Sequence, residues 1–514
     1  MKSLAEKLNL EVNPTVFFIS IAVILAFLIT GSVFPSATGE FFNDLQNFIV
    51  VNFGWFYIFA VAVFLVFALG LAISKYGKVK LGPDDSEPEY SYLSWFAMLF
   101  SAGMGIGLIF FSVAEPIFHY TDPPRAEAGT QGAFDESMLF TFFHWGVHAW
   151  AIYIIVGLSL AYFHFRRGLP LSIRSAFYPV LGKKIYGGYG DTIDILAVFG
   201  TMFGVATSLG LGVQQVGAGL SYVFGVENTT TLWVILIAII TAFATISVFL
   251  GLDRGIRRLS NFNMTLAFLL IIFVFIFGPT LYLLNSLMVN TGTYISNIVE
   301  LTFWMDTEDT GWQGGWTLFY WGWWIAWSPF VGMFIARVSK GRTLREFIIG
   351  VMFVPTALTF IWLTFFGNTG LMFEMEGVAE ISGVETDAML FAMLEHMPIA
   401  LLSSIAATIL IVTFFVTSSD SGSLVIDMLA SGGNPNPPRG QRVFWAISEG
   451  AVAAVLLIAG GLGALQTASI TTGLPFAVVL MLMSYSLVKG LRKEPEERAT
   501  TTKRYAAKKP EAQD

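Results

Sequence analysis

Long apolar runs separated by short polar segments make up most of this sequence. A helix needs about 20 residues to cross a bilayer, and runs near or above that length occur at residues 14–34, 53–74, 92–118, 137–163, 193–223, 231–252, 262–285, 316–336, 346–368, 400–430, 442–461 and 467–488. The pattern predicts an all-α integral membrane protein with twelve transmembrane helices. Because that number is even, both termini are expected on the same side of the membrane.

The composition agrees with this pattern and excludes several classes of protein. Of the 514 residues, 55% are hydrophobic and only 12% are charged, whereas about 25% of a soluble protein is charged. A soluble enzyme, a disordered chain and a disulfide scaffold are therefore excluded, the last because the chain has no Cys. The net charge of −8 gives no support for nucleic-acid binding. The first apolar run is longer than that of a secretory signal, so it is expected to remain as a membrane helix.

The basic residues predict the orientation of the helices. With the N-terminus in the cytoplasm, every Lys and Arg except Arg125 lies on the cytoplasmic side. Since Lys and Arg gather in cytoplasmic loops, both termini are predicted to be cytoplasmic. Outside, residues 290–304 predict a helix at the membrane interface. The charged tail after Lys489 is expected to be mobile or to contact anionic membrane lipids.

Three predicted spans carry residues that interrupt helices. Residues 103–107 are Gly-Met-Gly-Ile-Gly, residues 328–332 are Ser-Pro-Phe-Val-Gly, and residues 417–423 are all small or polar. Small residues can simply allow close helix packing, but broken helices inside a membrane persist where they line a cavity. Breaks at matching places in two halves of a chain indicate a transporter with a substrate site at the midplane.

The spacing of these breaks predicts an internal repeat. The third and eighth spans are five helices apart, so each can open a five-helix repeat of opposite orientation. The expected organisation is a cytoplasmic N-terminus with two peripheral helices at 1–91, a first repeat at 92–285, an external interfacial helix at 286–315, a second repeat at 316–490 and a charged cytoplasmic tail at 491–514. This organisation favours a carrier that works by alternating access.

Aromatic residues are concentrated in two of the spans. The fourth span contains Trp145, Trp150 and Tyr153, and the eighth contains four Trp between Trp321 and Trp327. A single Trp is usually part of the core or of the interfacial belt. Several rings in the middle of the membrane, without a carboxylate beside them, favour a pocket that holds a quaternary ammonium group by cation–π attraction.

Together these motifs resemble the betaine/choline/carnitine transporter family. The resemblance rests on residues 103–107, on Trp-Gly-Trp-Trp-Ile-Ala-Trp-Ser-Pro-Phe-Val-Gly at 321–332, on the aromatic series of the fourth span and on Thr-Ser-Ser-Asp-Ser at 417–421. It covers all twelve predicted spans and is closest to the sodium-coupled glycine betaine transporters. It implies a leucine-transporter-type 5+5 inverted repeat preceded by two extra helices, assembled as a homotrimer in the bacterial plasma (inner) membrane.

The resemblance also implies which residues bind the substrate. An aromatic box would hold the ammonium group, Trp327 would lie near the substrate carboxylate, and the unwound glycine segment would face the substrate. The expected substrate-binding residues are Trp145, Trp150, Tyr153, Trp324, Trp327, Met104, Gly105, Gly107, Phe330 and Ser208.

A sodium site is implied in the same way, with Na⁺ as coupling ion and no other cofactor. Its ligands would be backbone carbonyls of Ser101, Met104 and Phe414 and the hydroxyls of Thr417 and Ser418. Hard cations such as Na⁺ prefer oxygen ligands of this kind, although Ser and Thr hydroxyls often bond back to their own helix. In a second sodium site of the family, Thr201 matches the first threonine, but Val205 replaces the second.

The substrate and the coupling ion stay open within one main hypothesis. An acid at the position of Gly107 is typical of relatives that take choline, so glycine favours a zwitterion. We therefore expect Na⁺-coupled symport of glycine betaine into the cell. The alternatives are another osmolyte (ectoine, proline, dimethylsulfoniopropionate, taurine), choline or carnitine, coupling to protons, exchange, or a channel. No enzymatic motif is found.

Buried titratable residues give three weaker signals. His144 and His148 are spaced to share a metal, but without a third ligand we expect His148 in a hydrogen-bond network. Glu115 is expected near the outer end of its helix and in contact with water. Asp420 is expected to brace the break in the tenth span, with proton coupling as an alternative.

Overall fold

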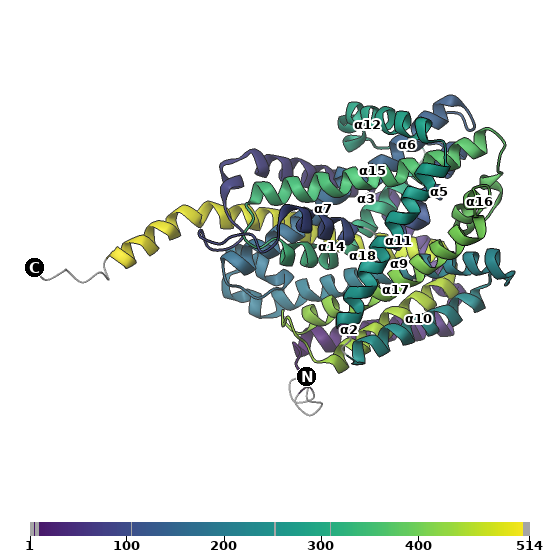
Figure 1. Ribbon diagram of the computed structural model, residues 1–514. Helices are drawn as coiled ribbons and strands as arrows, with labels where there is room; N and C mark the ends of the chain where they lie inside the picture. Colours follow the sequence, from purple (N-terminus) through teal and green to yellow (C-terminus); the bar gives the residue numbers. More distant parts are fainter. Residues whose placement is uncertain (1–4, 6–9, 104, 251–252, 309, 507–514) are drawn as a thin grey trace, which may run out of the picture.

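The computed structural model describes residues 5, 10–103, 105–250, 253–308 and 310–506 (Figure 1). In these ranges the chain is helical, and no strand is present. The longer helices are α2 (Pro14–Val33), α3 (Pro35–Ile73), α4 (Tyr92–Gly103), α5 (Ile106–Thr121), α6 (Gln131–Trp145), α7 (Val147–Ala161), α9 (Gly188–Phe224), α10 (Thr230–Leu250), α11 (Asp253–Phe277), α12 (Thr280–Phe303), α14 (Phe319–Val338), α15 (Leu344–Met375), α16 (Met389–Glu395), α17 (Ala400–Ala430) and α18 (Arg439–Ala506).

Short elements join these helices. They are η1 (Lys75–Lys78), η2 (Tyr162–Arg166), η3 (Ile173–Phe177), α8 (Tyr178–Leu181), η4 (Gly182–Tyr186), α13 (Thr310–Gln313), η5 (Gly314–Leu318), η6 (Ile381–Gly383) and η7 (Thr386–Ala388). Both η2 and η5 are π-helical turns that extend a long helix, η2 at the end of α7 and η5 before α14.

The predicted fold class is confirmed: the protein is an all-α, multi-span membrane protein. In the described residues, nine helices are long and apolar enough to cross a membrane, or ten when α4 and α5 count as one bent span. Two of the predicted spans, 442–461 and 467–488, lie in α18, which bends at Gly460 and Gly461. The count of twelve and the inverted repeat stay predictions.

The break predicted in the third span is present. Helix α4, over Tyr92–Ser101, and helix α5 meet at an angle of 67°. Gly105, just before α5, is extended, with φ −156° and ψ −179°. Met104 lies outside the described residues. A second break, which the sequence did not predict, separates α6 from α7 at Gly146. A Cβ built on Gly146 would lie 2.6 Å from the hydroxyl of Tyr294, so this bend needs glycine.

The other two predicted breaks are wrong, because side chains satisfy the backbone in both places. Helix α14 runs through Pro329. Proline cannot donate to the carbonyl four residues earlier, but the hydroxyl of Ser328 donates to that carbonyl, on Ile325, at 2.7 Å. Helix α17 is continuous across 417–423, and the hydroxyls of Thr417 and Ser423 donate to carbonyls of the preceding turn.

Helix α14 lies at the centre of the molecule. It packs against α7, α9 and α18, and Figure 1 shows these helices in the middle, with α10 and α12 at the periphery. Large side chains on the outer helices are exposed, for example Phe243 of α10 and Phe268 of α11. In a membrane these faces contact lipid, which explains why the exposed surface is so apolar.

Segments predicted to be cytoplasmic meet at one end of the bundle. Arg166 donates to the carbonyl of Gly82 at 2.7 Å, and the amide of Leu81 donates to the carbonyl of Arg342. Arg125, the single basic residue expected outside, pairs instead with Glu136 and Glu300 at 2.7 Å each. The predicted interfacial helix lies in α12, which begins earlier than expected, at Thr280.

Candidate functional site

The aromatic residues predicted to form a box come together between α6, α7 and α14. The ring of Trp324 meets Trp145 at 4.9 Å between centroids, with an interplanar angle of 70°. It also lies 6.3 Å from Tyr153, which is 5.4 Å from Trp150. All four side chains are buried. The break at Gly146 turns the chain between Trp145 and the rest of this series, so rings from two helices reach the same place.

A stack of rings on α14 supports one side of this cluster. Trp324 stacks on Trp323 at 4.8 Å and 13°, and Trp323 stacks on Phe319. A Cβ built on Gly107 would lie 2.2 Å from Cη2 of Trp323. Glycine is therefore required here for α5 to pack against α14. The contact of Gly107 with substrate stays a prediction.

Two buried polar atoms near this cluster lack a hydrogen-bond partner within the described chain. They are the hydroxyl of Tyr153 and Nε1 of Trp327. Trp327 packs against Phe330 at 5.4 Å, and a Cβ on Gly105 would meet its ring at 3.4 Å. Buried donors are nearly always paired, so both are available to a bound molecule. A carboxylate is the strongest acceptor for such donors.

The carboxylate of Glu115 lies directly behind the aromatic cluster, so the expectation that the rings have no carboxylate beside them is wrong. Its Oε2 accepts hydrogen bonds from Trp145 Nε1 at 2.7 Å and from the hydroxyl of Tyr320. Its Oε1 lies 2.6 Å from His144 Nδ1 and 3.2 Å from His119 Nε2. Glu115 is fully buried, so the expectation that it is solvated is wrong. The residues that shield it come from α6 and α14, and sequence position alone does not reveal them.

This network extends to a second ring of the cluster. Nε1 of Trp324 donates to the backbone carbonyl of His144 at 2.9 Å, and His144 Nε2 lies 3.0 Å from Thr317 Oγ1. The buried acid thus orients Trp145, while the backbone of α6 holds Trp324. The sequence reasoning missed this role; an acid at membrane depth was the signal that could have revealed it.

The histidines divide into two groups. Glu115, His119 and His144 present ligand atoms within 4.8 Å of one another and could hold a metal ion. Both oxygens of Glu115 already accept hydrogen bonds, which accounts for the cluster without a metal. His148 is separate, because its Nε2 contacts Thr302 Oγ1 at 2.8 Å. The expected hydrogen-bond role of His148 is confirmed.

The residues expected to bind sodium lie on adjacent helices. Phe414, Thr417 and Ser418 are on α17, which packs along α9 with Thr201. Thr417 Oγ1 accepts from Asn263 at 3.3 Å and donates within its own helix. Thr201 also donates to its own helix, to the carbonyl of Ala197.

Three further predicted residues remain, of which Ser208 is expected to bind the substrate and Ser101 and Met104 to bind sodium. Ser208, one helical turn past Gly204 on α9, donates to the Gly204 carbonyl at 3.3 Å. Ser101 is in the last turn of α4, and Met104 lies outside the described residues. The sodium site therefore stays a prediction.

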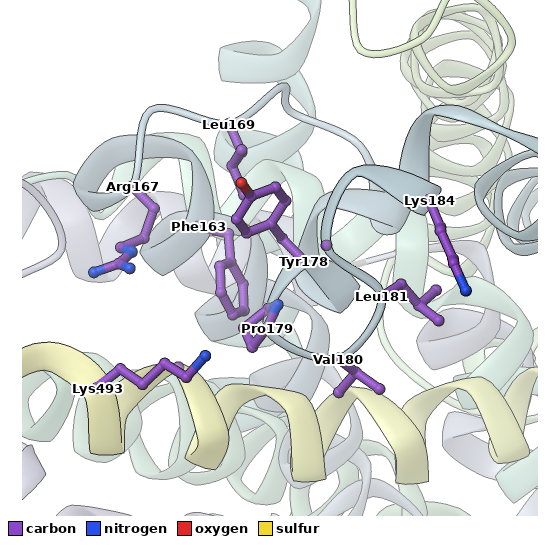
Figure 2. A pocket seen from close by; sticks show the side chains of 11 residues that line it. Phe163, Arg167, Leu169, Tyr178, Pro179, Val180, Leu181, Lys184 and Lys493 are labelled. Atoms are coloured by element: carbon purple, nitrogen blue, oxygen red, sulfur yellow. The ribbon is translucent and has the colours of Figure 1, made fainter.

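A cavity of about 520 Å³ lies away from the aromatic cluster, near the end of α7 (Figure 2). Phe163 and Tyr178 line it, with Arg167, Lys184 and Lys493 around them. Phe163 is ten residues beyond Tyr153, or about 15 Å along a helix. The cavity is thus not part of the aromatic site.

A bundle of membrane helices with a bend beside a buried aromatic cluster defines a membrane transport protein. The family profile described as "BCCT, betaine/carnitine/choline family transporter" matches residues 15–496. The chain therefore belongs to the betaine/carnitine/choline transporter family, and the resemblance seen in the sequence is confirmed.

Similar proteins from several bacteria agree. A glycine betaine transporter of Acinetobacter baylyi is 51% identical over 94% of this chain and 74% of its own length. One of Bacillus subtilis is 47% identical over 94% of this chain and 95% of its own. A glycine betaine/proline/choline transporter of Vibrio parahaemolyticus is 46% identical, covering 95% of this chain and 91% of its own.

Proposed function

We propose that this transporter carries glycine betaine, or a similar zwitterionic compatible solute, into the cell by Na⁺-coupled symport. The observation that carries the proposal is the buried cluster of Trp145, Trp150, Tyr153 and Trp324, next to donors without partners. The names of the relatives from Acinetobacter and Bacillus support betaine as the substrate.

Both ends of glycine betaine find suitable chemistry here. The trimethylammonium group cannot donate hydrogen bonds, so ring faces attract it best, at about 2 kcal/mol per desolvated cation–π contact. The carboxylate of Glu115 behind Trp145 adds negative charge on that side. The free donors, Tyr153 Oη and Trp327 Nε1, suit the substrate carboxylate. A zwitterion uses both features, whereas choline would leave the donors unpaired.

Alternating access needs elements that move. The bends at Gly105 and Gly146 join short half-helices on either side of the aromatic cluster, and such discontinuous helices are typical of carriers. Sodium would bind between α4, α9 and α17, at the carbonyls of Ser101, Met104 and Phe414 and the hydroxyls of Thr417 and Ser418, with Thr201 as a candidate for a second ion.

The cellular setting belongs to the same proposal. We expect a homotrimer in the bacterial inner membrane, with both termini in the cytoplasm and lipids around the exposed apolar faces. The gathering of basic loops at one end supports this orientation. The basic cavity of Figure 2 lies at that end, where anionic lipid headgroups would be found.

A second candidate is a broader substrate range. The Vibrio relative is named for proline and choline as well as glycine betaine. Proline has a ring ammonium group that can donate, and the acceptor that the described cluster offers it, the Tyr153 hydroxyl, is also a donor suited to the substrate carboxylate. We therefore expect weaker transport of proline than of betaine, measured as competition against labelled betaine.

The test uses the purified protein in sodium-free liposomes with radiolabelled glycine betaine. Uptake under an inward Na⁺ gradient is compared with uptake under an equal K⁺ gradient at matched osmolality. Uphill accumulation only with Na⁺ is the expected result. Rapid exchange against preloaded betaine without accumulation would instead mean an antiporter that does not use Na⁺, and flux without any uphill accumulation would mean a channel.

A further inference from the structure

Glu449 is a buried acid with one oxygen that accepts no hydrogen bond from the described residues. It lies in the first part of α18 and is fully buried. The hydroxyl of Ser419 donates to its Oε2 at 3.1 Å. Its Oε1 has no hydrogen-bond partner among the described residues. Buried carboxylate oxygens rarely lack a hydrogen-bond partner, so we expect this oxygen to bind a ligand.

The free oxygen points into the junction of three helices. A Cβ built on Gly422 of α17 would lie 2.8 Å from Glu449 Oε1, and 3.1 Å from a methyl group of Val205 on α9. Gly422 thus leaves the space that Oε1 needs, and Val205 closes it with apolar atoms. The Val205 side chain offers no oxygen to Oε1.

Glu449 shares the basic residue within its electrostatic reach with a second acid, so the two acids carry one more charge than that residue balances. The charged groups within electrostatic reach are Asp420 and Arg442. Arg442 is engaged by Asp420, with Nη2 2.7 Å from Oδ1. Of the other helices packed here, α2 and α10 contain no titratable residue. Helix α11 packs on α17 and has its charged residues at its start, from Asp253 to Arg258. The acids of α9, Asp191 and Asp194, lie in its first two turns and pair with Arg174.

A buried carboxylate without a cation is unfavourable by several kcal/mol at least. Glu449 must therefore bind a cation or a proton. A sodium ion needs several oxygen ligands, whereas the residues next to Oε1, Gly422 and Val205, offer it no side-chain oxygen. A proton needs only that one oxygen, and the protonated group can still be held by Ser419.

We propose that Glu449 is a proton-binding site at the junction of α9, α17 and α18, and that its proton crosses the membrane together with the substrate. The carboxylate takes a proton from water on the outer side, forming one O–H bond, and releases it to water on the inner side. Each cycle moves one positive charge inward in addition to sodium.

The location links this site to ion coupling, and in this respect the inference rests on the proposed function. Ser419 directly follows Thr417 and Ser418, the predicted sodium ligands, and Val205 is one helical turn beyond Thr201 on α9. A movement of α17 or α9 that opens the sodium site would also change the surroundings of Glu449. Access of water to Oε1 can thus alternate with the transport cycle.

The test follows proton movement during transport. Liposomes with a fixed inward Na⁺ gradient contain a trapped pH-sensitive dye, and betaine is added outside. The wild type is expected to acidify the interior. Glu449→Gln keeps the shape and the Ser419 contact but carries no exchangeable proton, so it should take up betaine with Na⁺ and lose the acidification. The matched control is Asp427→Asn, since Asp427 is another buried acid with an unpartnered oxygen; it should acidify like the wild type.

A second measurement does not depend on transport or on the variant's activity. Infrared spectra near neutral pH should contain the carbonyl band of a neutral carboxylic acid, shifted by deuteration and absent in Glu449→Gln. Na⁺-driven betaine uptake without acidification, or unchanged acidification in Glu449→Gln, would overturn the proton site alone. Loss of acidification in Asp427→Asn but not in Glu449→Gln would assign the proton to Asp427. Absence of both betaine binding and uptake would overturn the proposed function, and the infrared band would then decide the proton site by itself.

Discussion

The indole Nε1 of Trp145 donates a hydrogen bond to Glu115 Oε2 over 2.7 Å, so a buried carboxylate fixes a ring of the aromatic cluster. The same acid contacts His144, whose backbone carbonyl holds Nε1 of Trp324. A cation–π contact is strongest when the cation lies over a ring face. The orientation of Trp145 thus depends on a side chain that need not touch the substrate itself, and Trp324 is held by the backbone of the same helix, α6.

Glu115→Gln should therefore weaken betaine binding while the protein stays folded. The NH₂ group of the amide would face one of the groups that donate a hydrogen bond to Glu115, so two donors would face each other. A buried unpaired group costs about 1–3 kcal/mol, or roughly a tenfold to hundredfold rise in the KM for betaine if the rings turn away. Uptake kinetics measure KM and kcat, and tryptophan fluorescence measures binding.

The matched control for this prediction is Glu136→Gln. Glu136 lies earlier on α6, pairs with Arg125 at 2.7 Å and is not part of the cluster. Its KM should stay unchanged. A lower kcat with unchanged KM in Glu115→Gln, at a normal melting temperature, would show that Glu115 does not position the rings.

Trp324 is the ring on which the cluster depends most, since it contacts both Trp145 and Tyr153. Loss of one desolvated cation–π contact is worth about 2 kcal/mol, or roughly a thirtyfold loss of affinity. Trp324→Ala should therefore abolish measurable uptake at low betaine, and Trp324→Phe should restore part of it. Trp55→Ala removes an exposed tryptophan of α3 and should have no effect on affinity. Equal affinity in Trp324→Ala and the wild type would reject the aromatic box.

The fold class could be predicted from the sequence because it follows from composition and spacing, whereas the membership of the aromatic cluster, Trp324 included, was implied by the resemblance to the family. Apolar runs of membrane length need no tertiary information, and Trp145, Trp150 and Tyr153 lie within nine residues of one another along the chain. The break at Gly103–Gly107 was also recognisable, since three glycines in five residues disfavour a helix.

Other features depended on contacts between distant residues. The break predicted at Pro329 is absent because the hydroxyl of Ser328 donates to the carbonyl that proline leaves free. The sequence pattern alone does not decide whether a Ser-Pro pair breaks a helix or is accommodated in this way. At the break beside Gly146, the amide of Val147 donates to the hydroxyl of the distant Tyr294. The partners of Glu115 include Tyr320, which is 205 positions away, so only the packed structure brings them together.

Substitution of Gly107 tests whether close packing or contact with the substrate requires glycine at this position. A methyl group at this position would lie 2.2 Å from Trp323, whereas a methyl group at Gly70 of α3 would meet nothing within 4 Å. Gly107→Ala should displace Trp323, disturb the Trp324 ring stacked on it, and raise the KM for betaine. Gly70→Ala is the matched control and should behave as the wild type. Gly107→Asp tests the expectation that an acid at this position admits choline. Because the aspartate side chain would meet Trp323 in the same way, betaine uptake should be lost, and choline uptake is then measured in the same variant.

Removal of sodium ligands gives the last prediction. Na⁺ prefers oxygen ligands, and Thr417→Val with Ser418→Ala removes two hydroxyls from α17 without changing its apolar packing greatly. The Na⁺ concentration for half-maximal uptake should rise several-fold, while the KM for betaine at saturating Na⁺ changes little. Thr413→Val removes a hydroxyl of the same helix that bonds only to Ile409 and Leu410 among the described contacts, and it should leave the sodium curve unchanged. If the double variant and the wild type share one sodium curve, the ion binds elsewhere, and the hydroxyls of Thr417 and Ser418 serve only to keep α17 helical.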